Sequence, residues 1–175
     1  MFPLIAQIFG WTATLCSVIT YVLRSRKAIL GAKVSADLLS VIHYFLLGAF
    51  TGGLVCSINV VRGILYYNRD SKITSHILCP ITFIALNLIS CAFSWLGWIS
   101  LLPAIGSSIG VIGMWMKNPV RIRLVMVPAI TLWLIYGVLI GSVQTVVSNI
   151  FTLVSIGVGL TRDVLEWKQK NRSAA

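Results

Sequence analysis

The stretch that decides the fold runs from residue 132 to residue 159 and reads LWLIYGVLIGSVQTVVSNIFTLVSIGVG. It has the apolarity of two membrane helices, which a tight turn at Gly141-Ser142-Val143 would join. Trp133 and Asn149 stand out from this apolar pattern, one near the middle of each expected helix. Neither residue is needed on a simple lipid-facing surface, so the hairpin is predicted to hold part of a polar site.

Trp133 and Asn149 are sixteen residues apart, and the same spacing separates His43 and Asn59 earlier in the chain, in IHYFLLGAFTGGLVCSINVVRG. A repeated hairpin with a polar or amphipathic group at the same depth predicts a site between two repeats. An imidazole can bind a ligand or carry a proton, and an amide offers two donors and an acceptor. The structural alternative is a neutral histidine bonded to a neighbouring helix and asparagines that join helices. The predicted substrate-binding residues are His43, Asn59, Trp133 and Asn149.

Composition indicates a polytopic membrane protein. The chain has 175 residues, of which 58% are hydrophobic and 10% are charged, and its mean hydropathy is +0.94. A soluble domain would carry about a quarter charged residues. The net charge of +10 would suggest a nucleic-acid partner in a soluble protein, but loop cations that set membrane topology explain it better here. We therefore expect no nucleic-acid partner.

Seven apolar segments alternate with charged or glycine-rich boundaries. With the N-terminus outside and the C-terminus inside, 13 of the 14 Lys and Arg residues lie on the cytoplasmic side, as the positive-inside rule requires. The expected spans are 4–23, 34–51, 53–68, 75–94, 99–116, 122–140 and 143–162.

The odd number of spans predicts an all-α fold in a 3+1+3 arrangement. Residues 1–70 and 98–165 are expected to form two three-helix repeats, and residues 71–97 a linker helix between them. Three spans end on the opposite side of the membrane, and the single linker span returns the chain to the side on which it began. The two repeats therefore run parallel. Residues 166–175 are expected to be a frayed cytoplasmic tail.

Arg62 is the one cation that lies inside an expected span away from its ends, and Asp37 is its nearest plausible partner by depth. The sequence predicts an ion pair, a shared polar network or a gate between them, with snorkelling of Arg62 to the inner headgroups as the alternative. No metal-ligand cluster, phosphate-binding loop or catalytic carboxylate pair is apparent. We therefore expect neither a cofactor nor an enzymatic activity.

The blocks LLSVIHYFLLGAF, SINVVRGILYY and LLPAIGSSIG resemble bacterial inner-membrane proteins of the YgjV type. Separately, LWLIYGVLIG and VVSNIFTLV resemble the second and third helices of a SWEET or SemiSWEET unit. In that family a Trp and an Asn of each three-helix unit line the central pocket, which by resemblance implies Trp133 and Asn149 here, with His43 and Asn59 in the first unit. The resemblance implies the 3+1+3 plan and an inner-membrane location.

These expectations favour a carrier of a small polar solute, such as a sugar, that works by alternating access. Two alternatives stay open: a carrier of another metabolite that is proton-coupled through His43, and a non-transporting membrane scaffold. The expected partners are the lipid bilayer and the solute, and self-association into a homo-oligomer is left open.

Overall fold

The computed structural model describes all residues except 1, 47, 49, 68–75, 96 and 173–175. The described residues form seven α-helices and one short 3-10 helix, so the predicted all-α class is confirmed. The elements are α1 (Phe2–Thr20), α2 (Arg26–Leu46), α3 (Phe50–Tyr67), α5 (Leu78–Phe93), η1 (Trp98–Ser100), α6 (Leu101–Trp115), α7 (Pro119–Leu139) and α8 (Val143–Arg172).

Several helices have the length and apolarity of membrane spans. Within the described residues, four helical stretches are long and apolar enough to cross a bilayer, and two apolar helices are shorter. Many large apolar side chains point outward, as expected of helices whose outer faces meet lipid rather than water. The four long stretches are Arg26–Leu46, Trp98–Trp115, Pro119–Leu139 and Val143–Glu166, and the two shorter ones are Ile5–Thr20 and Leu78–Phe93.

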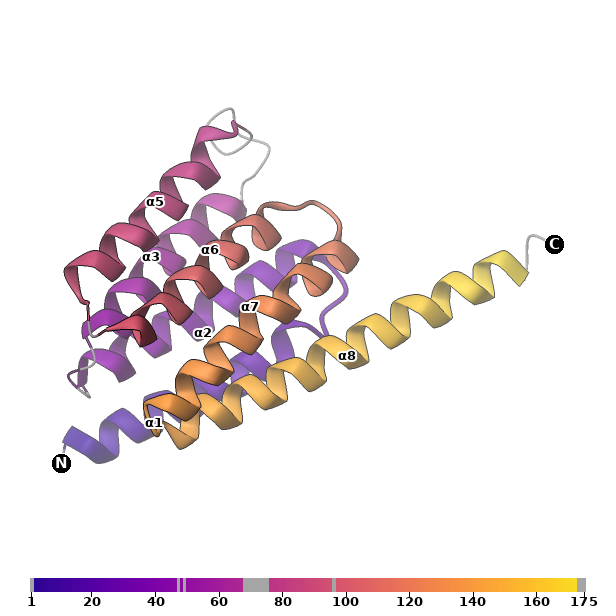
Figure 1. The fold of residues 1–175 in the computed structure, drawn as a ribbon. Coiled ribbons are helices and arrows are strands. Elements are labelled where there is room, and N and C mark those ends of the chain that lie inside the picture. Colours follow the sequence, from indigo (N-terminus) through magenta and orange to yellow (C-terminus); the bar gives the residue numbers. More distant parts are fainter. Residues whose placement is uncertain (1, 47, 49, 68–75, 96, 173–175) are drawn as a thin grey trace.

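Two helices extend well beyond the predicted bounds. Helix α2 begins at Arg26 rather than at residue 34, because its basic residues find partners and need not lie in a loop. Helix α8 continues through the expected tail to Arg172, and its polar part is supported by contacts such as Arg162 with Glu166 one turn later. Figure 1 shows the last turns of α8 extending past the other helices.

Six of the helices form a closed ring. Helix α2 packs between α1 and α3, and α7 packs between α6 and α8. Two seams close the ring, one where α1 meets α8 and the other where α3 meets α6. Helix α5 lies outside the ring against α6 and α3, at the edge of the molecule in Figure 1.

The two ends of the ring differ in chemistry. We call the end with the 21–25 and 116–118 connections the basic end, and the end with Gly48 and the 140–142 connection the turn end. In Figure 1 the N-terminus lies at the turn end, and the C-terminus lies beyond the basic end. A buried cluster packs the basic end tightly and includes Tyr21, Ile29, Tyr66, Met114 and Ile122.

Matching turns relate the two halves. Helices α2 and α7 both have 21 residues, and each ends before a glycine in the left-handed conformation, Gly48 at φ 72° and Gly141 at φ 67°. Both glycine amides donate to the carbonyl three residues earlier, Phe45 and Val138, at 3.1 Å. These positions correspond at a constant offset of 93 residues (141 − 48).

This offset corrects the register read from the sequence. The predicted pairs, His43 with Trp133 and Asn59 with Asn149, lie about one helical turn away from strict correspondence. At the offset of the turns, His43 corresponds to Tyr136. A shift of one turn keeps a residue on nearly the same helix face, so the apolar pattern alone did not detect the difference.

Candidate functional site

A cavity lies inside the ring and is lined by residues from all six ring helices. It has about 110 Å³ open to the centres of water molecules, and one water needs roughly 10–15 Å³ by this measure. The cavity can therefore hold several waters or a small solute. Its lining includes every residue singled out from the sequence: Asp37, His43, Asn59, Arg62, Trp133 and Asn149.

The lining follows the same offset as the turns. Sixteen of the lining residues form eight pairs, each separated by 93 positions. The pairs are Ala13 with Gly106, Thr14 with Ser107, Ser17 with Gly110, Lys33 with Met126, Asp37 with Ile130, Ser40 with Trp133, Cys56 with Asn149, and Asn59 with Thr152. Positions 93 residues apart thus meet around one space, although their side chains differ in charge and polarity.

His43 is buried against the first helix. Its Nδ1 lies 2.7 Å from the Ala6 carbonyl oxygen, so Nδ1–H is the donor in this contact. The imidazole meets the Tyr44 ring edge-on at a centroid separation of 5.3 Å, and the Tyr44 hydroxyl lies 3.5 Å from Thr145 Oγ1. His43 thus has a structural bond to a neighbouring helix and also lines the cavity.

The two asparagines are engaged differently. Asn149 Nδ2 donates to the Thr145 carbonyl within its own helix at 2.8 Å. Asn59 is buried, and its Oδ1 has no hydrogen-bond partner among the described residues. Trp133 is half-buried and packs edge-on against Tyr136, with ring centroids 5.7 Å apart. Asn59 therefore has unused capacity for a ligand, whereas Asn149 already satisfies one of its donors.

The structure gives Asp37 a different partner from the one expected. Asp37 Oδ1 forms an ion pair with Lys33 one turn earlier on α2, and Oδ2 has no partner among the described residues. Arg62 is only 3% exposed and does not snorkel to a surface. Its NH1 donates to the Ser107 carbonyl on α6 at 3.4 Å. Asp37 and Arg62 share the cavity, but no ion pair joins them in the described part of the chain.

Several buried polar atoms of the lining residues have no protein partner. Within the described residues these are Tyr21 Oη, Asp37 Oδ2, Asn59 Oδ1, Arg62 Nε and Ser107 Oγ. A buried polar atom without a partner costs about 1–3 kcal/mol, so native proteins rarely gather several in one place. Such a cluster is typical of a site whose polar content comes from water or a ligand.

The basic end is closed by a network around Arg123. Arg123 Nε and NH2 donate to the carbonyls of Tyr21 and Leu23 at 2.9 and 2.7 Å, and NH1 pairs with Asp163. Arg162 NH1 donates to the Val22 carbonyl at 2.7 Å. Helices α7 and α8 therefore hold the connection that follows α1.

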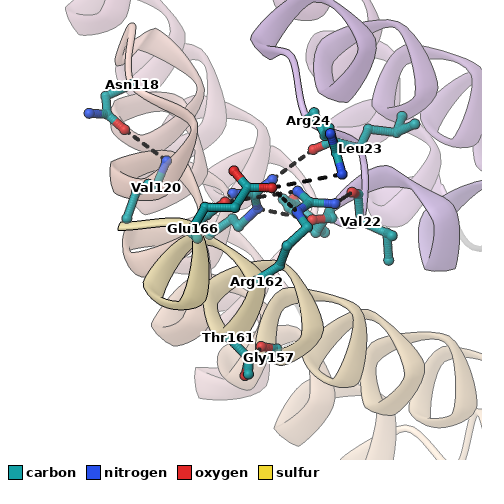
Figure 2. A network of polar contacts seen from close by, with 12 residues as sticks. Val22, Leu23, Arg24, Asn118, Val120, Gly157, Thr161, Arg162 and Glu166 are labelled. Carbon is teal, nitrogen blue, oxygen red and sulfur yellow. Dashed lines mark hydrogen bonds and ion pairs between the residues drawn. The ribbon is translucent and has the colours of Figure 1, made fainter. Parts of the chain in front are cut away.

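Figure 2 shows this region, with Arg162 reaching the Val22 carbonyl and Glu166 facing both Arg162 and Arg24. The α7 N-terminus lies nearby, where the Asn118 side chain caps the Val120 amide at 2.8 Å.

A second arginine holds the other half in a matching way. Arg26 Nε donates to the Met116 carbonyl at 2.9 Å, and its NH2 approaches the Met114 carbonyl at 3.4 Å. These acceptors correspond to Leu23 and Tyr21 at the offset of 93. Each half thus places an arginine of its second helix on the end of the other half's first helix.

Reasoning from the sequence missed the residues that become important only through long-range contacts. Lys33 was assigned to a loop, and only its spacing of four from Asp37 hinted at a helical pair. Arg123 lies at the cytoplasmic end of an expected span, where the charge pattern favours a topology-setting cation, but the structure buries it to 1% exposure. Gln144 and Thr145 lie in the first turn of α8 and line the cavity, although their sequence position does not distinguish them from ordinary polar residues at the end of a span.

Comparison with known proteins gives one family. Searches among curated proteins and among solved structures gave no match. A family model described as a bacterial inner membrane protein matches residues 4–166, which is nearly the whole chain. This match agrees with the apolar outer surface and with the expected membrane location. The chain is a member of the Imp-YgjV family of bacterial inner membrane proteins.

Proposed function

We propose that this protein carries a small polar solute across the bacterial inner membrane through the central cavity. The observation that carries the proposal is the cavity lining itself, which combines residues of both halves with several unpartnered polar atoms. A buried space of this kind in a membrane bundle would be costly without polar content. In this proposal His43, Asn59, Trp133 and Asn149 contact the solute.

The proposed architecture is seven spans in a 3+1+3 arrangement of two parallel repeats. The repeats are residues 1–70 and 98–165, and residues 71–97 supply the linker span. The matching glycine turns, the paired lining positions and the two equivalent seams support this arrangement. Transporters built from such repeats bind substrate near the middle of the membrane, between the repeats.

Alternating access follows from the same architecture. In the described conformation the arginine contacts and the packed cluster close the basic end. Rocking about the α1–α8 and α3–α6 seams would break these contacts and expose the cavity on that side. We place the basic end in the cytoplasm and the N-terminus outside, because the described loop cations collect at that end.

Uptake into proteoliposomes tests the proposal. The purified protein is reconstituted, and uptake of sugars, amino acids and organic acids is measured against empty liposomes. We expect saturable uptake of at least one class. Asn149→Ala should reduce it about tenfold, whereas Asn118→Ala, which alters a helix cap outside the cavity, should leave it intact. Uptake equal to that of empty liposomes for every class would refute the carrier proposal.

Proton coupling through His43 is the second candidate. The Ala6 contact leaves Nε2 able to accept a proton while the ring lines the cavity. Coupled uptake would rise when the outside is made acidic, and His43→Gln would abolish that rise in whatever uptake the variant retains. Uptake that ignores an imposed pH gradient in the wild-type protein would eliminate coupling but not transport.

A non-transporting scaffold is the remaining alternative. It needs no polar cavity, so substitutions that fill the cavity without unfolding the protein would leave a scaffold unaffected. Loss of solute uptake on filling the cavity therefore separates the two functions.

A further inference from the structure

The charges around Arg62 identify the kind of solute that the cavity accepts. Arg62 is 3% exposed on α3, inside the helix ring, where an arginine cannot lose its charge and is costly without an anionic partner. Three of the chain's four acids are in the described residues, and each is already engaged. Asp37 pairs with Lys33, Asp163 with Arg123, and Glu166 contacts Arg24 and Arg162.

Arg62 is held against a small-residue face that leaves its guanidinium open to the cavity. Its NH1 lies beside Gly110, where an added Cβ would come within 3.8 Å, and it donates to the Ser107 carbonyl. This long contact is its single hydrogen bond with the described residues, and Nε has none. A guanidinium presents five donors in a rigid fork, so most of them remain unused.

The neighbouring lining residues add further donors. The hydroxyls of Tyr21 and Ser107 are buried without partners, and both residues line the cavity with Arg62. Lys33, Asp37 and Arg62 together carry one net positive charge, and Asp37 forms its ion pair with Lys33 while its charge also acts on Arg62. Asp37 Oδ2 is a free acceptor in the same space. The set is thus cationic and rich in donors, with the acceptors Asp37 Oδ2 and Asn59 Oδ1 beside it.

We propose that the cavity binds a small organic carboxylate, with the carboxylate on Arg62 and a hydroxyl or ammonium group of the same solute on Asp37. The guanidinium fork matches the two oxygens of a carboxylate. A spherical ion such as chloride cannot accept hydrogen bonds from the fork in the same bidentate way. The proposal deepens the proposed function and rests on it, because it names the substrate class of that same cavity. An uncharged sugar would leave the Arg62 charge without a partner.

Thermal unfolding of the full-length protein in detergent tests the binding step. The probes are small carboxylates of two to six carbons as potassium salts, each compared with its uncharged primary amide and with potassium chloride. We expect at least one carboxylate, at about tenfold excess over its Kd, to raise the wild-type midpoint by roughly 3–6 °C. Its amide and chloride should give no shift. This comparison needs no variant, so it decides the proposal even if substitutions impair folding.

Variants then locate the site. Arg62→Gln should abolish the shift, and Arg62→Lys should weaken binding about tenfold or more, because it keeps the charge but loses the fork. Arg24→Gln removes the same charge from a side chain that is 79% exposed and lies outside the cavity, so its shift should match the wild type. The proposal is overturned if no carboxylate shifts the midpoint, if amides or chloride act equally, or if Arg62→Gln retains the shift.

Proteoliposomes separate this inference from the proposed function. If the protein exchanges uncharged solutes but no carboxylates, the carboxylate assignment is wrong and the carrier proposal still stands. If carboxylates bind in a way that depends on Arg62 but no solute is exchanged, the carrier proposal is wrong and the carboxylate assignment still stands. The two proposals therefore fail on different measurements.

Discussion

At the scale of single residues, Arg123 is the largest side chain that the fold buries almost completely. Arg123→Gln would leave Asp163 with a weaker partner and release the Tyr21 and Leu23 carbonyls. Breaking a buried charged pair typically costs about 3–5 kcal/mol, and we expect a loss of that size in the free energy of unfolding. Unfolding in mixed detergent micelles would measure it. Arg121→Gln, an exposed neighbour, should change little, and equal effects of both changes would contradict this role.

Gly159 provides a residue-scale test of how closely α8 packs on the same network. A Cβ at this position would lie 2.5 Å from the Tyr21 carbonyl oxygen and 2.6 Å from Arg123 Nε. Gly159→Ala should therefore be destabilising, by roughly 1–3 kcal/mol as for other overpacked sites. Gly157→Ala on the same helix meets nothing within 4 Å and should be neutral or slightly stabilising. Equal melting temperatures for the two variants would refute the close approach.

At the scale of elements, the glycine turns after α2 and α7 should behave alike. Gly48 and Gly141 both have positive φ, and an added Cβ would touch nothing within 4 Å at either position. Alanine at either position should then cost only the conformational penalty, about 1–2 kcal/mol. Gly31→Ala, with equal space but no positive φ, serves as the control and should cost nothing. Clearly unequal losses for the two turn variants would argue against equivalent turns.

The helices could largely be predicted from the sequence, because apolar length and flanking cations are local signals. Their exact ends could not, since Arg26 and Lys33 look like loop residues until their long-range and helical partners are known. The repeat register was missed for a related reason. Which of the chain's 14 glycines takes a positive φ is not visible in the sequence, and Gly48 and Gly141 are the residues that define the offset.

Part of the cavity lining could be predicted, because rare polar residues in apolar segments are easy to recognise. His43, Asn59 and Arg62 indeed line one cavity with Trp133 and Asn149. Their individual partners depend on helix rotation and on side chains far away in the sequence. The Ala6 contact of His43 and the Ser107 contact of Arg62 could not have been read from spacing.

At the scale of the whole molecule, alternating access predicts that the distance between the two halves at the basic end takes two values, one in each conformation. Arg24 and Lys117 are exposed, occupy corresponding positions in the two halves, and can be replaced by spin-labelled cysteines. The background would lack the four native cysteines, which are free thiols. We expect pulsed electron paramagnetic resonance to give two distance populations whose ratio changes when a transported solute is added. One narrow population that no transported solute alters would contradict the rocking motion.

The central claim is that solute passes through the cavity inside the ring, and filling that cavity tests it most directly. Ser148→Trp places a large side chain in the lining, whereas Ile150→Trp places one on a position of α8 that is 47% exposed and faces outward. Exchange of the accepted solute is measured in proteoliposomes containing equal amounts of folded protein. The account predicts that the Ser148 variant loses exchange and the Ile150 variant retains it. Undiminished exchange by folded Ser148→Trp would contradict the account.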